Sequence, residues 1–143
     1  MKMNVKKLNS GFTLVELMVV VLIIGVISAV AIPSYMEMIR EGNRTDAQTV
    51  LNDVAHRLQR CFTTYSTYNN DNCAVAASIT EGNSIESEKG YYTVTGILAA
   101  ATFDLTAQPV AGKSQSKDSE CTALKLDEAG ARTATGSNTS ECW

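Results

Sequence analysis

The stretch FTLVELMVVVLIIGVISAVAI, from Phe12 to Ile32, is the most apolar run in the 143-residue chain and decides the fold. A helix of these 21 residues would be about 31 Å long, because an α-helix rises about 1.5 Å per residue. This length matches the hydrocarbon core of a bilayer, so the run predicts a membrane helix. Glu16 is its one ionisable residue, of a type that costs about 2.5–3.5 kcal/mol at the centre of a bilayer.

The segment before this run is basic. Lys2, Lys6 and Lys7 precede it without any acidic residue, which by the positive-inside rule places the amino end in the cytoplasm and the rest of the chain across the membrane. An ordinary signal peptide has a shorter apolar stretch and a small-residue cleavage site after it, and this segment has neither. We therefore expect the apolar helix to remain in the mature protein.

After Pro33 the pattern becomes that of an amphipathic helix running to about residue 62. Its apolar residues recur at steps of three and four: Ala47, Val50 or Leu51, Val54, Leu58 and Phe62. The charged and polar residues between them are predicted to face solvent: Arg44, Asp46, Asp53, Arg57 and Gln59. Gly25 and Pro33 are weak points of the long helix, either as a hinge or as residues that it merely tolerates.

The remainder predicts a small antiparallel sheet. Residues 63–89 are rich in Asn, Thr and Ser and predict an irregular loop. Residues 90–98, 102–110 and 121–127 have the alternation and β-branched content of strands, and a short fourth strand could follow the turn at 127–132. One apolar face should pack on the helix: Tyr92, Val94, Phe103, Leu105, Leu124 and Leu126. The fold class is α+β, with a long N-terminal helix on a β-meander.

Four cysteines lie beyond the apolar run: Cys61, Cys73, Cys121 and Cys142. An even number on the translocated side favours disulfides, and the absence of C-x-x-C together with a single histidine argues against zinc. Nearest-neighbour pairing, Cys61 with Cys73 and Cys121 with Cys142, would tie down the two segments least able to order themselves, and the crossed pairings stay open. We expect no metal and no cofactor.

The segment KKLNSGFTLVELMVVVLIIGVISAVAIPSY closely resembles the N-terminal signature of type IV prepilins over about residues 5–35. The resemblance implies that a prepilin peptidase and methyltransferase removes a leader, residues 1–11, by cutting between Gly11 and Phe12, and N-methylates Phe12. It also makes Glu16 the family glutamate, which the Phe12 amine of an adjacent subunit can neutralise in a filament. Gly25 and Pro33 match positions associated with local unwinding of the helix in filaments.

The resemblance also implies an organisation and a location. Residues 12–33 would be the transmembrane and filament-core helix, and residues 34–143 the globular pilin domain, whose β-meander and C-terminal region occupy 90–143. The subunit would be held in the inner membrane with its C-terminal domain in the periplasm. The pilus assembly machinery would then incorporate it among other pilin subunits in a cell-surface pilus. The fold expected is that of a type IV pilin.

The C-terminal half looks like the minor pilins of the PilE/ComP group. The favoured function is therefore a minor subunit that supports pilus assembly, adhesion and twitching motility. Two alternatives remain: a DNA-binding minor pilin acting in natural transformation, and a type II secretion pseudopilin. Lys113 and Lys117 are the leading candidates for DNA contact, with Lys89, Lys125 and Arg132 as the others, although Asp118 and Glu120 dilute the first pair.

The charge argues against general nucleic-acid binding. The net charge is −3 and becomes more negative if the three leader lysines are removed, whereas such proteins are usually basic. An enzyme is not expected, because no nucleophile, base and oxyanion-stabilising groups emerge together.

Overall fold

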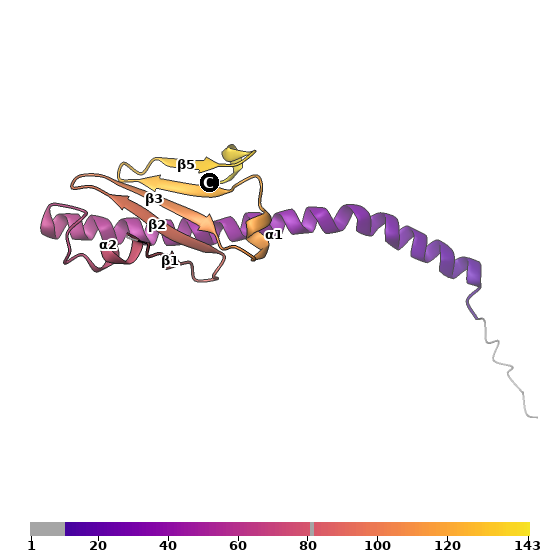
Figure 1. Ribbon diagram of the computed structural model, residues 1–143. Helices are drawn as coiled ribbons and strands as arrows, with labels where there is room; N and C mark the ends of the chain where they lie inside the picture. Colours follow the sequence, from indigo (N-terminus) through magenta and orange to yellow (C-terminus); the bar gives the residue numbers. More distant parts are fainter. Residues whose placement is uncertain (1–10, 81) are drawn as a thin grey trace, which may run out of the picture. The chain divides into compact units, whose positions relative to one another are not determined.

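The fold is described from a computed structural model, in which residues 11–80 and 82–143 are placed. The leader lysines Lys2, Lys6 and Lys7 lie outside these described residues. The helices are α1 (Leu14–Tyr65) and α2 (Ala74–Ile79), with the 3-10 turns η1 (Ser114–Lys117) and η2 (Thr139–Glu141). The strands are β1 (Ile85–Glu86), β2 (Tyr92–Leu98), β3 (Phe103–Pro109), β4 (Ala123–Asp127) and β5 (Arg132–Thr135) (Figure 1).

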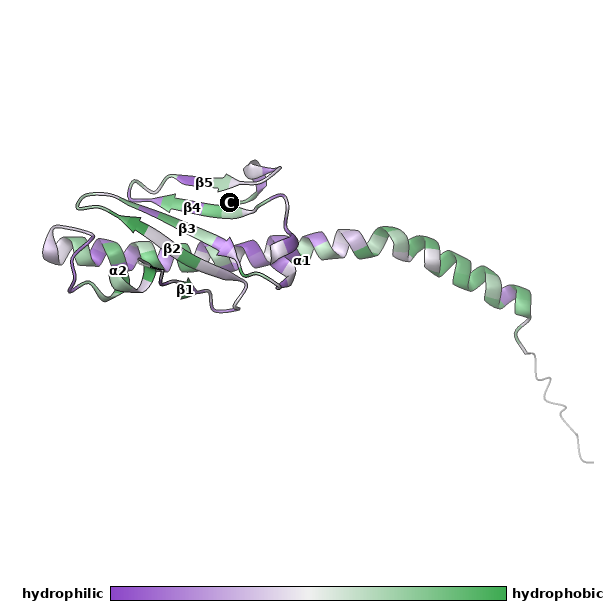
Figure 2. Cartoon of the chain, in the orientation of Figure 1, coloured by the Kyte–Doolittle hydropathy of each residue, from purple (hydrophilic) through white to green (hydrophobic). Residues whose placement is uncertain are grey.

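Two units divide the chain, one ending at Glu37 and a compact globular unit from Met38 to Trp143. Helix α1 contributes to both, and its N-terminal half is almost uniformly hydrophobic (Figure 2). The helix is continuous through Gly25 and Pro33, so neither residue breaks it in this single chain. Unwinding at these two positions in a filament stays a prediction.

In the globular unit, one stripe of α1 packs on the sheet as the periodicity predicts. Its core members are fully or almost fully buried: Ala47, Val50, Leu51, Val54 and Leu58. The prediction for two polar residues is wrong, because Arg44 and Asp46 are 3% and 8% exposed rather than facing solvent. The helical period predicts that a charged residue lies beside the apolar stripe. It cannot show that a loop later in the sequence covers that residue.

The prediction of an irregular loop over 63–89 is only partly right. Helix α1 continues to Tyr65, and α2 buries Val75, Ala76 and Ile79 against the core. Tyr68 also packs inward, with its ring centroid 5.0 Å from that of Phe103. A six-residue helix and a two-residue strand are too short to produce a clear period, which explains why the sequence pattern hides them.

The sheet is an antiparallel meander in the order β1-β2-β3-β4-β5 (Figure 1). Register pairs Val94 with Ala107 and Ala107 with Leu124, so small and large apolar residues meet on one face. That face is buried as predicted: Tyr92, Val94, Phe103, Leu105, Leu124 and Leu126. The alternation therefore predicted both the strands and the side of the sheet that covers α1.

Both disulfides follow the nearest-neighbour pairing, with Cα separations of 5.8 Å for Cys61–Cys73 and 5.6 Å for Cys121–Cys142. The second holds the C-terminus, where the Cys142 carbonyl accepts a hydrogen bond from Gln48 Nε2 at 3.0 Å. Trp143 donates from Nε1 to the Thr133 carbonyl at 2.8 Å. The last two residues are thereby joined to both α1 and β5.

Gly136 allows the backbone after β5 to approach the segment before β4. Its φ is +140°, and a Cβ atom there would collide with the Glu120 carbonyl and lie 3.0 Å from the Cys121 nitrogen. We expect Gly136→Ala to lower the free energy of unfolding by about 3 kcal/mol or more, since backbone strain and overpacking add. Urea unfolding followed by fluorescence of Trp143, the single tryptophan, measures this change.

Gly130→Ala is the matched control. Gly130 also has a positive φ, +79°, but a Cβ atom there would meet nothing within 4 Å. This variant should lose only about 1–2 kcal/mol, the cost of the left-handed backbone. Equal losses in the two variants would show that the contact with residue 120 is unimportant.

Candidate functional site

The N-terminal half of α1 is an apolar surface with nothing covering it in the single chain. Every large apolar side chain from Phe12 to Ile32 is at least 49% exposed. The helix is long and apolar enough to cross a membrane. An apolar surface of this extent is characteristic of contact with lipid or with other proteins.

The predicted cleavage site lies just before this helix. Gly11, Phe12 and Thr13 are exposed and non-helical, and α1 begins at Leu14. A peptidase would therefore meet the bond between Gly11 and Phe12 outside the hydrogen-bonded helix. Cleavage there and methylation of Phe12 stay predictions.

Glu16 takes part, through its backbone, in a local contact that the sequence analysis did not predict. Its backbone N–H donates to Thr13 Oγ1 at 3.2 Å, so Thr13 caps the start of α1. Thr13-x-x-Glu16 is the sequence of a capping box, and an acidic side chain in the first turn also complements the helix dipole. In the sequence, the motif TLVE at residues 13–16 is the signal that indicates such a cap. The observed bond uses the Glu16 backbone, so the capping-box role of its carboxylate and its intersubunit role both stay predictions.

The lysine-bearing turn η1 is fixed to α1 by one buried side chain. Gln115 is fully buried, and its Nε2 donates to the Arg40 carbonyl at 3.2 Å and to Asp118 Oδ2 at 2.9 Å. Its Oε1 accepts a hydrogen bond from Asn43 Nδ2 at 3.3 Å. The turn therefore presents the exposed Lys113 and Lys117 from a rigid base.

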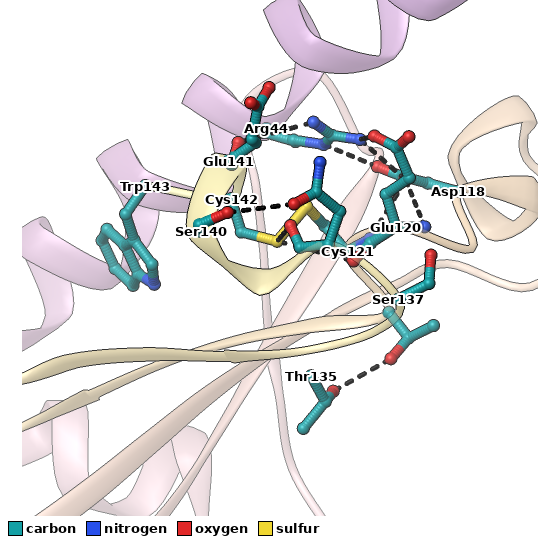
Figure 3. Close-up of a disulfide and its surroundings, with 12 residues drawn as sticks. Arg44, Asp118, Glu120, Cys121, Thr135, Ser137, Ser140, Glu141, Cys142 and Trp143 are labelled. Atoms are coloured by element: carbon teal, nitrogen blue, oxygen red, sulfur yellow. Dashed lines mark hydrogen bonds and ion pairs between the residues drawn. A yellow bond between two sulfur atoms is a disulfide. The ribbon is translucent and has the colours of Figure 1, made fainter.

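Arg44 and Asp118 form the ion pair at the centre of this base (Figure 3). The guanidinium donates from Nε and a terminal nitrogen to the two carboxylate oxygens at 2.8 and 2.9 Å, a bidentate geometry. It also reaches Glu120 Oε2 at 3.1 Å. Cys121, bonded to Cys142, follows directly, so the ion pair joins α1 to the C-terminal disulfide region.

The environment of Asp118 favours its charged form. Burial alone raises the pKa of the carboxyl, but hydrogen bonds from Arg44 and from the Cys121 and Glu120 N–H groups, together with the guanidinium charge, lower it below its ordinary value of 3.8. A depressed pKa in the folded state stabilises the fold at neutral pH. Asp118 is thus a stabilising carboxylate rather than a surface charge.

Stability should accordingly fall in acid. Because the folded-state pKa of Asp118 is depressed, its contribution is complete above the ordinary value of 3.8 and is lost as the pH falls through the folded value. We expect urea unfolding free energies of the wild type to drop below about pH 4. Asp118→Asn should be less stable at pH 7 and show a shallower acid dependence; parallel curves would contradict the role of this carboxylate.

The five candidate DNA-contacting residues do not form one cluster. The main chain joins the turns that carry Lys89 and Lys113, because the Val110 N–H donates to the Tyr91 carbonyl at 2.9 Å. Lys125 instead lies on the outer face of β4, opposite Thr106 and Thr133. Arg132 stacks on Trp143, 5.3 Å from the ring centroid.

The basic group considered at η1 is therefore the exposed pair Lys113 and Lys117. The structure corrects the expected dilution of this group for Asp118 but not for Glu120. Asp118 is 3% exposed and neutralised by Arg44, so it does not oppose this group at the surface. Glu120 remains partly exposed, although it contacts the same guanidinium.

Comparison with known proteins identifies the family to which this chain belongs. The family model described as "Type IV minor pilin ComP, DNA uptake sequence receptor" matches residues 33–125, more than half of the chain. The chain belongs to this family of type IV minor pilins. A second model, described as the prokaryotic N-terminal methylation motif, matches residues 6–32. The family consists of structural pilus subunits and not of enzymes.

Individual relatives are fimbrial proteins. The minor pilin is 30% identical over 106 residues to the type IV major fimbrial protein FimA of Dichelobacter nodosus, spanning 72% of this chain and 62% of that protein. It is 29% identical over 135 residues to a fimbrial protein of Moraxella nonliquefaciens, spanning 88% and 81%. The crystal structure of the Neisseria meningitidis non-core minor pilin PilV matches with a TM-score of 0.53 and 19% identity, over 71% of this chain and 91% of that one. This last likeness concerns the fold alone.

Proposed function

We propose that this minor pilin is cut after Gly11, N-methylated at Phe12 and incorporated into a type IV pilus. Residues 1–11 are then the leader, residues 12–33 the membrane and filament-core helix, and residues 34–143 the periplasmic domain that reaches the cell surface in the pilus. The prepilin peptidase and the inner-membrane assembly machinery are its processing partners. In this position the subunit supports pilus assembly, adhesion and twitching motility.

The exposed apolar surface of α1 carries this proposal. The apolar run of α1 is about 31 Å long, and its exposure to water in the single chain is unfavourable. Lipid, and then the helices of neighbouring subunits in the filament, would cover it. The match to the methylation motif over residues 6–32 supports the processing step. Fimbrial relatives favour the pilus over a type II secretion pseudopilin.

Fractionation of cells tests this proposal. Antibodies against the globular unit should detect the chain in the inner membrane and in sheared pili, and intact mass should show an N-terminal methylated Phe12. Deleting the gene should reduce surface pili and twitching. Absence from pili combined with a loss of protein secretion would instead identify a pseudopilin.

DNA binding is the second candidate function, because one observation now favours it. The family model that matches residues 33–125 is described as a DNA uptake sequence receptor, and the match includes the whole Lys113–Lys117 turn. Contact with phosphates needs exposed cationic side chains, here Lys113 and Lys117. Gln115 and the Arg44–Asp118 ion pair hold the turn that carries these lysines against α1. The acidic net charge keeps the expected affinity low.

Removing the two lysines of the turn should weaken DNA binding. Fluorescence anisotropy of a labelled duplex, titrated with the full chain in detergent at several salt concentrations, should show weak binding that salt abolishes. Lys113→Gln/Lys117→Gln should reduce the slope of log affinity against log salt by about two, or about one for each lost phosphate contact. The loss should be the same for every duplex sequence, because phosphates carry no sequence information.

Lys125→Gln is the matched control, since it removes the same charge from the outer face of β4. Its salt slope should equal that of the wild type. An unchanged slope in the double variant would exclude the turn as the contact. Tight binding to one duplex sequence at physiological salt would instead establish a sequence-specific receptor.

A further inference from the structure

The turn η1 lies beside the residues with which α1 enters the globular unit. This unit begins at Met38, and Gln115 Nε2 donates to the carbonyl of Arg40, two residues later, at 3.2 Å. Gln115 Oε1 accepts a hydrogen bond from Asn43 Nδ2 at 3.3 Å, and the Gln115 side chain is fully buried. The turn is therefore fixed at the start of the unit.

The continuity of α1 limits how far this level can be from the apolar run. The run ends at Ile32, and the helix continues without a break to Arg40. The eight residues between them measure about 12 Å along the helix. The headgroup region extends about 5–8 Å beyond the hydrocarbon core on each side. Arg40 thus lies about 4–7 Å or less from the headgroups, within the Debye length of about 8 Å at physiological ionic strength.

Tyr35 is a second indication of where the bilayer surface meets α1. It follows Ile32 by three residues, and it is 63% exposed in the single chain. Tyrosine is enriched at the boundary between hydrocarbon and water, because its ring is apolar and its hydroxyl is polar. An exposed tyrosine at this position therefore supports a bilayer surface that lies just before Arg40.

Lys113 and Lys117 are the cations that η1 presents at this level. They lie two residues on either side of Gln115, and both are exposed. Among the described residues, no ion pair gives either lysine a carboxylate. The acid that follows them, Asp118, is buried against Arg44. Both ammonium groups are therefore available to an anion outside the chain.

Helix α1 itself carries little net charge at this level. Glu37 and Glu41 are acidic, and Arg40 between them is basic. These carboxylates oppose an anionic surface, so any attraction has to come from the turn. With the two lysines of η1 there are three cations and two carboxylates, a net charge of +1.

We propose that Lys113 and Lys117 bind the phosphates of anionic phospholipids while the subunit is held in the membrane. The inference rests on the proposed function, because only insertion of residues 12–33 brings a bilayer to this level. Basic residues next to a membrane helix are attracted to anionic lipids, and an ammonium on a flexible stem contacts a phosphate as a point charge. The contact holds the start of the globular unit against the periplasmic leaflet and is broken when the subunit enters the pilus.

Amine labelling of the full chain in nanodiscs tests this contact. An adjacent phosphate favours the ammonium form of a lysine, whereas only the neutral amine reacts with the N-hydroxysuccinimide ester of acetic acid. Lys113 and Lys117 should be acetylated about threefold more slowly in discs containing phosphatidylglycerol than in discs of phosphatidylcholine alone. Mass spectrometry of the digested chain measures each rate. Sodium chloride at about 0.5 M should remove the difference, because salt screens exposed charges.

Lys89 is the matched control within the same molecule. It is also exposed, but its backbone N–H donates to Asp46, which lies six residues beyond Arg40 and thus about 9 Å farther along α1. At this distance the headgroup charge is screened, so the acetylation rate of Lys89 should be the same in both kinds of disc. Slowing of Lys89 equal to that of the η1 lysines would show a general effect of the lipid and overturn the inference.

The remaining outcomes separate the inference from the proposed function. If the chain elutes with both kinds of disc and Lys113 and Lys117 react equally fast in them, the lysines do not bind lipid, while membrane insertion stands. Failure of the chain to enter either kind of disc refutes both. Slowing by added duplex DNA, but not by phosphatidylglycerol, would assign the two lysines to DNA and overturn the lipid contact.

Discussion

Replacing Arg44 by methionine is expected to lower the free energy of unfolding by about 3–5 kcal/mol. The substitution keeps an unbranched side chain but leaves Asp118 charged, 3% exposed and without its guanidinium. Removing one partner of a buried ion pair costs more than the pair itself contributes, because the remaining charge is desolvated and uncompensated. Urea unfolding of the full chain in detergent, followed by Trp143 fluorescence, should show the loss.

A second variant separates charge from packing. In Arg44→Met/Asp118→Asn the uncompensated charge is gone, while the asparagine Oδ1 can still accept the Glu120 and Cys121 N–H groups that bond Asp118 Oδ1. The double variant should therefore be more stable than Arg44→Met alone, although below the wild type. If the two variants are equally unstable, the loss comes from packing around residue 44 and not from the buried carboxylate.

Glu16→Val is expected to remove the chain from pili without preventing membrane insertion. Valine makes the helix more apolar, so insertion should be as good as that of the wild type, and cleavage between Gly11 and Phe12 should continue. In the filament the Phe12 amine of the neighbouring subunit would lose its carboxylate partner and stay charged in an apolar core. Sheared pili should contain less than about a tenth of the wild-type amount, while processed protein accumulates in the inner membrane.

Glu16→Gln separates this intersubunit role from helix capping. Glutamine serves in a Thr-x-x-Gln capping box as glutamate does, so the start of α1 should keep its local stabilisation. It cannot neutralise an amine, and we expect it to assemble as poorly as the valine variant. Wild-type assembly of Glu16→Gln, with failure of Glu16→Val, would assign the function of Glu16 to the Thr13 cap instead.

The sheet and the buried stripe of α1 could be predicted because both depend on regular periods. Alternation in 102–110 placed Phe103 and Leu105 on the buried face, and steps of three and four placed Leu51 and Leu58 there. Prediction failed where an element is too short to repeat its pattern. Helix α2 has six residues and β1 has two, so neither repeats its pattern often enough to be distinguished from a loop.

The candidate sites show a second limit. Arg44 looked exposed because a charged residue beside an apolar stripe normally faces water, and its partner Asp118 lies 74 residues later. No local pattern indicates such a pairing. The lysines of the η1 turn were identified from charge alone, but the buried Gln115 that holds the turn has the appearance of an ordinary loop residue in sequence. Residue type therefore indicated the chemistry, and only the fold showed which groups meet.

The attachment of the last three residues has a consequence for the order in which the molecule is made. Arg44 contacts the Glu141 carbonyl, and Gln48 contacts the Cys142 carbonyl, across 97 and 94 residues of chain. Synthesis proceeds from the amino end, so α1 is made long before Glu141 and Cys142, whose carbonyls bond to it. The bonds of Arg44 to Glu141 and of Gln48 to Cys142 can form only after these last residues have been made. The C-terminus is thus the closing step of maturation, and a chain released a few residues early would lack both the second disulfide and the Trp143 contact that finish the fold.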